Sequence, residues 1–110
     1  MRMNDLQMAD LPLSVVARET LITLASAIPE IDRLILFGSR AQGTARSDSD
    51  IDLAVSGARL QADAVARLWS AIDDSDLLYP IDLVHLHAGT EPELSAAIAR
   101  QGVVLWSRDR

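Results

Sequence analysis

The chain has 110 residues, a formal net charge of −6, and 49% hydrophobic residues, few of which are aromatic. This length supports one hydrophobic core, so we expect a single domain over residues 1–110, and the composition excludes a disordered or fibrous protein. The sequence has no cysteine, which excludes disulfides, thiolate zinc sites and cysteine nucleophiles, and its acidic surplus argues against direct binding to nucleic acid or to a membrane surface.

The N-terminal residues do not have the pattern of a targeting segment. Residues 1–10 are polar with scattered methionines, and we expect them to form a flexible lead-in. The most apolar stretch that follows begins after Glu19 and ends at Pro29, which is too late and too short for an export or membrane segment. We therefore expect a cytoplasmic protein.

The first half of the chain predicts one helix and two strands. Apolar residues recur at helical spacing over residues 12–28, and Pro29 ends that helix. The run DRLILFG, residues 32–38, predicts a buried strand that stops at its glycine. Residues 39–49 are small and polar, and they predict a loop with space for one helical turn. The run DIDLAV, residues 50–55, predicts a second strand with acidic and apolar residues on opposite faces.

The second half predicts two further helices around a third strand. Residues 60–72 have helical apolar spacing, and YPIDLVHL, residues 79–86, predicts a strand. TEPE has the form of a capping box, with Thr90 as the N-cap of a helix that closes at Gly102. VVLW, residues 103–106, predicts either a short final strand or a packed tail. The order of these elements indicates a small α/β fold with helices packed against one sheet.

Three aspartates form the strongest candidate site. Residues i and i+2 of a strand project to the same side, so Asp50 and Asp52 present two carboxylates on one face. Asp82 lies within the third predicted strand, and it completes a three-carboxylate cluster if that strand is the neighbour of the second. Carboxylate oxygens suit Mg²⁺, and three carboxylates could hold two metal ions about 4 Å apart for an in-line phosphoryl transfer.

A second pair of aspartates has the same spacing, and a glycine-serine turn adds a candidate phosphate-binding element. Asp48 and Asp50 have the same spacing, but we favour Asp50 with Asp52, because these residues alternate with core residues inside the strand. Gly38 and Ser39 follow the first strand. Glycine lets a phosphate approach the backbone closely, and the serine hydroxyl and nearby N–H groups can donate hydrogen bonds to it.

The stretch FGSRAQGTARSDSDIDLAV, residues 37–55, resembles the signature of the minimal nucleotidyltransferase family, a branch of the polymerase-beta-like superfamily. In that family Gly-Ser is followed after ten residues by Asp-x-Asp, as Gly38-Ser39 is followed here by Asp50-Ile51-Asp52. The later runs IDLVHL and IARQGVVLW resemble the third-carboxylate strand and the tail of the family. The resemblance implies a small mixed β-sheet packed with helices, in the order α-β-α-β-α-β-α.

The resemblance also implies a reaction and a partner. Stand-alone members of this size resemble the antitoxin half of two-gene toxin–antitoxin systems, of the kind called type VII. Such an antitoxin transfers AMP from ATP to a tyrosine of its partner, an all-helical HEPN-domain ribonuclease toxin, and so blocks RNA cleavage. The implied roles are Mg²⁺ binding, with two ions, by Asp50, Asp52 and Asp82, and proton removal from the attacking hydroxyl by Asp82.

The same resemblance implies that Ser39 and Gly38 hold the nucleotide triphosphate. Arg40 is expected to contact the triphosphate by bidentate hydrogen bonds, and Arg46 is interpreted as a solvated loop arginine. Gln42 departs from the family, because many relatives have a basic residue at this position.

Simpler interpretations apply to the remaining polar and aromatic residues. His85 and His87 alternate, but strand parity points His85 away from Asp82, so we interpret both histidines as structural or surface residues. Trp69 and Trp106 are interpreted as core or partner-contact residues. Two other functions remain open: nucleotidyl transfer to a small molecule, and a non-catalytic module that neutralises a toxin by binding alone.

Overall fold

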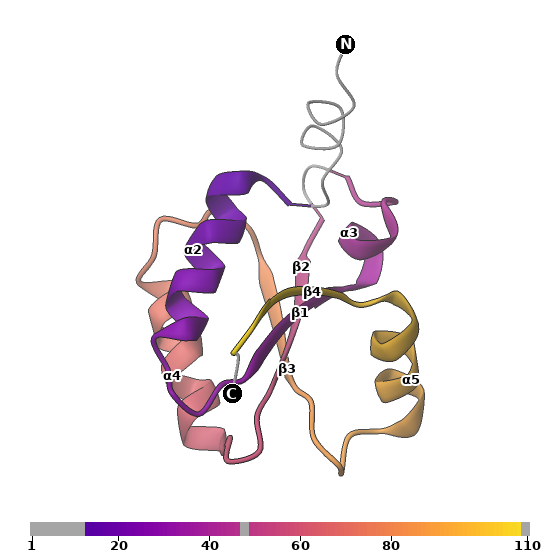
Figure 1. Cartoon of the computed structure of the whole chain (residues 1–110). Coiled ribbons are helices and arrows are strands. Elements are labelled where there is room, and N and C mark those ends of the chain that lie inside the picture. Colours follow the sequence, from indigo (N-terminus) through magenta and orange to yellow (C-terminus); the bar gives the residue numbers. More distant parts are fainter. Residues whose placement is uncertain (1–12, 47–48, 109–110) are drawn as a thin grey trace.

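The computed structural model describes residues 13–46 and 49–108, so the predicted lead-in at residues 1–10 and Asp48 lie outside the described residues. Helices and strands alternate along the described chain (Figure 1). In order, they are α2 (Val15–Ser26), β1 (Arg33–Phe37), α3 (Gly38–Gln42), β2 (Ile51–Ser56), α4 (Ala62–Asp73), β3 (Ile81–His85), α5 (Pro92–Gln101) and β4 (Val103–Ser107). The α/β prediction is confirmed, and the C-terminal run that could have been a strand or a tail is a strand.

The strands form one mixed sheet in the order β3-β2-β1-β4. β1 is antiparallel to both β2 and β4, whereas β2 and β3 are parallel. The chain connects this parallel pair through α4, because a parallel connection has to return to the starting end of the sheet. As a result β1 ends at the edge of the sheet where β2 and β3 begin. We call this edge the site edge.

Helices cover the two faces of the sheet unequally. α2 and α4 lie on one face, and α5 lies on the other (Figure 1). Side chains of β2 alternate between the two cores: Ile51, Leu53 and Val55 are fully buried in the larger cluster, and Ala54 is buried in the smaller one. Each fully buried Leu or Ile side chain stabilises the fold by about 1.5–3 kcal/mol. This packing holds β2 in register, so the acidic residues at its start have defined neighbours.

The start of α5 differs from the predicted capping box. Its N-cap is Glu91, whose side chain makes no capping hydrogen bond, and Pro92 occupies the first turn. The hydroxyl of Thr90 instead accepts a hydrogen bond from the backbone N–H of His87 at 2.9 Å. Proline has a backbone angle suited to the first helical turn and no N–H to satisfy, so the helix begins without the threonine cap. The predicted end is confirmed, since Gly102 is the C-cap.

One arginine ties the end of β4 to the loop between α2 and β1. Arg108 donates hydrogen bonds to the carbonyl oxygens of Ser26, Ile28 and Ile31, at distances of 3.0 to 3.1 Å. Its guanidinium also lies 4.8 Å from the centre of the Trp106 ring. A single side chain therefore donates to three carbonyl oxygens at the end of α2 and in the loop that follows it.

In the part of the chain that the structure describes, no helix has both the length and the apolar run needed to cross a membrane.

Candidate functional site

The turn after β1 places Gly38 and Ser39 at the site edge. Gly38 has a φ of +74°, in the left-handed region that residues with a Cβ rarely adopt, and it opens the short helix α3. A Cβ on Gly38 would overlap Oδ2 of Asp52 and would lie 3.0 Å from its Cγ. Glycine is therefore required at this position by the backbone conformation and, independently, by the closeness of Asp52.

Parallel pairing brings two of the predicted carboxylates to neighbouring positions. Asp52 of β2 and Asp82 of β3 are register partners, and adjacent strands lie about 4.8 Å apart. Asp50 precedes β2 by one residue and is two residues before Asp52. Asp50 and Asp82 are exposed, and Asp52 is half-buried. The condition on which the three-carboxylate cluster depended, that the third predicted strand neighbours the second, is confirmed.

The three carboxylates act on one another electrostatically. The pKa of Asp52 is raised above its ordinary value, first by burial and then by the negative charges of Asp82 and Asp50. Both causes disfavour the ionised form of Asp52. A bound cation would offset the repulsion among the carboxylates and favour the ionised form of Asp52, so this edge is electrostatically suited to a cationic ligand.

A divalent metal fits the chemistry of these donors, although the side chains as placed do not enclose one. Among residues 13–46 and 49–108, no group of three or more His, Cys, Asp or Glu side chains could hold a metal ion. Asp50 and Asp82 are exposed and can change rotamer. An all-oxygen donor set is the kind that Mg²⁺ takes, and Mg²⁺ keeps several water ligands, so it needs few protein ligands. The fit rests on donor type and on the repulsion that raises the pKa of Asp52.

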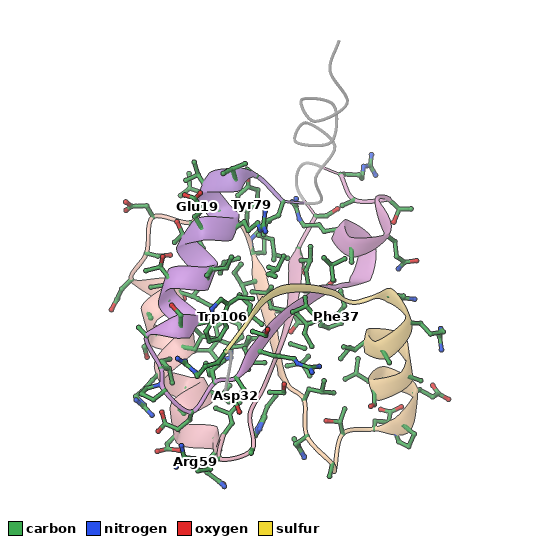
Figure 2. The ribbon with its side chains drawn as sticks, viewed as in Figure 1. Glu19, Asp32, Phe37, Arg59, Tyr79 and Trp106 are labelled. Atoms are coloured by element: carbon green, nitrogen blue, oxygen red, sulfur yellow. The ribbon has the colours of Figure 1, made fainter. Side chains whose placement is uncertain are left out.

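Arg40 lies inside the protein. It is 7% exposed, and its Nε and Nη2 atoms donate hydrogen bonds to the carbonyl oxygen of Ser49 at 3.2 and 2.8 Å. Its guanidinium carbon lies 5.0 Å from the centre of the Tyr79 ring. Tyr79 lies two residues before β3, and Figure 2 labels it. The contact between Arg40 and a triphosphate stays a prediction.

Sequence reasoning did not single out Ser49 or Tyr79, both of which contact Arg40. Ser49 lies inside the signature stretch of residues 37–55 without a role of its own there, Tyr79 belongs to no motif, and the two are 9 and 39 residues from Arg40 along the chain. Their partnership arises from the pairing of β2 with β3, which brings the residues before the two strands together. A tyrosine directly before a strand proline was the one visible signal, and it does not predict an arginine partner.

The two histidines lie at the other end of β3. The ring centres of His85 and His87 are 4.8 Å apart, and the pKa of His85 is lowered, first by burial and then by His87. Both residues line an open hollow of about 560 Å³ together with Asp32 and Gly57. The lining of this hollow includes none of the predicted site residues, so its size does not mark it as the place of the chemistry.

A Gly-Ser turn packed against carboxylates on adjacent strands of a small mixed sheet defines the nucleotidyltransferase class. Residues 19–110 match the family described as "Polymerase beta, Nucleotidyltransferase", and the chain belongs to that family. The resemblance seen in residues 37–55 is thereby confirmed.

The chain is also similar to individual proteins of known name or structure. The chain is 37% identical over 89 residues to the protein adenylyltransferase MntA of Shewanella oneidensis, in an alignment that covers 76% of this chain and 59% of that protein. A crystal structure of a toxin–antitoxin with AMP-PNP is similar at a TM-score of 0.63 and 32% identity, covering 84% of this chain and 74% of that one.

A further similar structure contains a modified toxin. It is the tri-AMPylated Shewanella oneidensis HEPN toxin in complex with MNT antitoxin, with a TM-score of 0.58 and 29% identity over 84% of this chain and 71% of that one. The chain thus spans a little under two thirds of the curated relative, namely 59% of its length, and most of the structural relatives.

Proposed function

We propose that this chain is a Mg²⁺-dependent nucleotidyltransferase that moves AMP from ATP to a tyrosine hydroxyl of a HEPN-domain toxin, and that it acts as the antitoxin. The observation that carries the proposal is the pairing of Asp52 with Asp82 beside Gly38. The pairing supports an in-line transfer, in which groups that bind phosphate and groups that bind metal act at one edge. Similarity to MntA, and to structures containing AMP-PNP or an AMPylated HEPN toxin, supports the choice of nucleotide and acceptor.

Binding of the triphosphate is assigned to the turn after β1. Because Gly38 has no side chain, the carboxylate of Asp52 lies directly against the turn, and Ser39 supplies a hydroxyl and a backbone N–H as hydrogen-bond donors. Asp50, Asp52 and Asp82 are the residues that would hold Mg²⁺, which when bound neutralises charge on the phosphates and on the carboxylates.

The acceptor side of the reaction is assigned to Asp82. It is exposed at the site edge, so a hydroxyl carried by another protein can reach it. Asp82 takes the proton as the tyrosine oxygen attacks the α-phosphorus of ATP. The new bond joins the tyrosine oxygen to the α-phosphorus, the bond from the α-phosphorus to the β-bridging oxygen breaks, and pyrophosphate leaves. Catalysis of this kind consists mainly of positioning and charge stabilisation.

The direct test is the intact mass of a candidate acceptor. A HEPN-domain protein is incubated with the chain, ATP and Mg²⁺, and its mass is measured. We expect a gain of one or more AMP units, which is absent with EDTA and absent with Asp50→Asn or Asp52→Asn. Asp76→Asn is the matched control, because it removes one exposed carboxylate from a loop and should transfer AMP normally.

The same experiment separates the other two functions. A tight complex without a mass gain, together with growth rescue by an Asp50→Asn/Asp52→Asn double variant, would overturn transfer in favour of neutralisation by binding. Release of pyrophosphate with an aminoglycoside, but with no protein acceptor, would favour a small-molecule acceptor. Peptide mapping of the modified partner tests whether the acceptor is a tyrosine.

A further inference from the structure

Arg40 is the one buried charged side chain among the residues that the structure describes. Burying a guanidinium is unfavourable unless its N–H groups find acceptors, so a buried arginine indicates a specific arrangement around it. Here the arrangement joins parts of the chain that carry the candidate site. Arg40 directly follows Ser39 in α3.

The contacts of Arg40 reach the two segments that bear the carboxylates. Two of its nitrogens donate to the carbonyl oxygen of Ser49, at 3.2 and 2.8 Å, and Ser49 immediately precedes Asp50. The face of the guanidinium lies over the Tyr79 ring at 5.0 Å, and Tyr79 stands three residues before Asp82. One side chain from α3 therefore contacts the residues that lead into β2 and into β3.

Hydrogen bonds of the neighbouring backbone make these two segments one unit. The N–H of Ile51 donates to the carbonyl oxygen of Pro80 at 2.8 Å. The N–H of Arg46 donates to the hydroxyl of Ser49 at 2.8 Å, and the N–H of Ser49 donates to the carbonyl oxygen of Arg46 at 3.0 Å. Arg46 and Ser49 are thus bonded to each other, and Ile51, which follows Asp50, is bonded to the residue that precedes the strand of Asp82.

We propose that Arg40 is a positioning residue, which holds the segments bearing Asp50 and Asp82 in place relative to Ser39. We call the contacts of Arg40 with Ser49 and Tyr79 the clamp, and they are a feature of the fold. The effect of the clamp on catalysis rests on the proposed function. Arg40 then has a role different from the triphosphate contact expected from the sequence. The side chain acts on the reaction through the carboxylates, not by touching the nucleotide.

Arginine suits this clamp better than lysine. Its planar fork directs two N–H groups to one carbonyl oxygen while its face stacks on an aromatic ring. A lysine keeps the charge but cannot provide both contacts. A phosphate contact made by charge would be partly retained by Arg40→Lys, whereas the clamp would not.

The experiment compares Arg40→Lys and Arg40→Met with Arg59→Met, a control at the opposite end of the molecule (Figure 2). Amide hydrogen exchange is followed by NMR, binding of Mn²⁺ alone by electron paramagnetic resonance, and AMP transfer by kcat and KM for ATP. Both Arg40 variants should speed exchange of the Ile51 amide and weaken Mn²⁺ binding by about ten-fold or more, the usual effect of removing a residue that orients metal ligands. The Leu36 amide, within β1, should exchange as in wild type.

The kinetic signature separates positioning from phosphate binding. Positioning predicts a kcat reduced by about ten-fold or more with a KM for ATP that stays within about two-fold, because displaced catalytic groups slow the chemical step. An increased KM for ATP, with kcat, Mn²⁺ binding and Ile51 exchange unchanged, would overturn the inference. Arg59→Met should behave as wild type in every measurement.

Two provisions keep the test decisive. If neither Arg40 variant folds, Tyr79→Leu removes only the stacking surface, and it should show the same loss of Ile51 protection and of Mn²⁺ affinity; wild-type values would overturn the clamp. If the wild-type chain transfers no AMP, the proposed function fails, while hydrogen exchange and Mn²⁺ binding still decide the role of Arg40.

Discussion

Asp52 and Asp82 are register partners on the two parallel strands, and the charge of Asp82 helps to raise the pKa of Asp52. The pairing that assembles the candidate site therefore also works against the stability of the unliganded fold. Like charges on neighbouring strands are destabilising, and a half-buried carboxylate loses part of its hydration. Such a conflict is typical of functional sites, where a ligand supplies the missing compensation.

Asp52→Asn is expected to stabilise the metal-free protein. Because the folded-state pKa of Asp52 is raised above 3.8, stability falls as pH rises from the unfolded-state pKa through the folded-state pKa. Asparagine removes that loss. In EDTA at neutral pH the free energy of unfolding should rise by up to about 1 kcal/mol, the scale of partly exposed charge interactions.

Urea unfolding in EDTA measures this difference. Asp76→Asn, which changes the net charge equally at an exposed loop position, should leave the midpoint nearly unchanged. A destabilised Asp52→Asn variant would contradict the idea that this edge is electrostatically unfavourable without a ligand. The stabilised variant should nevertheless have lost AMP transfer.

Gly38 and Gly43 both have a left-handed backbone, but only Gly38 lies against Asp52. Comparing their alanine variants therefore distinguishes the cost of backbone strain from the cost of that contact. Gly43, with φ +78°, has no atom within 4 Å of the place where a Cβ would stand, whereas a Cβ on Gly38 meets the carboxylate of Asp52. Gly43→Ala should therefore cost about 1 kcal/mol, the strain of a left-handed alanine, with AMP transfer retained.

Gly38→Ala should cost clearly more than Gly43→Ala and should abolish transfer, because Asp52 has to move away from its place beside the turn. Thermal unfolding and the intact-mass assay, run on both variants, make the comparison. Equal losses of stability, with transfer kept in both, would show that the closeness of Gly38 to Asp52 has no functional weight.

Arg108→Ala should destabilise the protein by about 2–3 kcal/mol, because hydrogen bonds from a charged donor to three loop carbonyls are lost together. Arg67→Ala is the matched control. Arg67 forms an ion pair with Glu30 at 2.7 Å, but the Arg67 side chain is 52% exposed, so its removal should cost about 1 kcal/mol or less. Chemical denaturation of the two variants checks the order, and a larger loss for Arg67→Ala would contradict it.

Stability should decrease on the acid side of neutrality through His85. Its pKa is lowered below 6.5 in the folded state, so the unfolded chain binds more protons as pH falls through 6.5, and stability declines until the folded-state pKa is passed. His85→Gln should reduce this acid sensitivity in urea unfolding series. An NMR titration of the His85 ring measures the pKa directly.

His87→Gln provides the control for the cause of that shift. The pKa of His85 should rise only part of the way toward 6.5 in this variant, because burial is the larger cause and the charge of His87 the smaller one. A complete return to 6.5 would assign the shift to His87 instead.

Local patterns were sufficient for most elements, and they failed where a competing contact decided the outcome. The spacing of apolar residues predicted α2, α4 and α5, and alternation predicted the faces of β2. The capping box at Thr90 was wrong, because Pro92 suits the first turn of α5 and the threonine hydroxyl bonds to His87 instead. The final strand was ambiguous because its pairing partner, β1, lies far away in the sequence.

By itself the sequence determined the elements, the alternation that puts Asp50 and Asp52 on the side opposite the larger core, and the Gly38-Ser39 turn, because these depend on neighbours a few residues apart. The tertiary structure alone decided that Asp82 pairs with Asp52, that Asp52 lies against Gly38, and that Arg40 lies inside against Ser49 and Tyr79. Strand order and register follow from the packing of the whole sheet against its helices, and no local pattern encodes which distant segments that packing brings together.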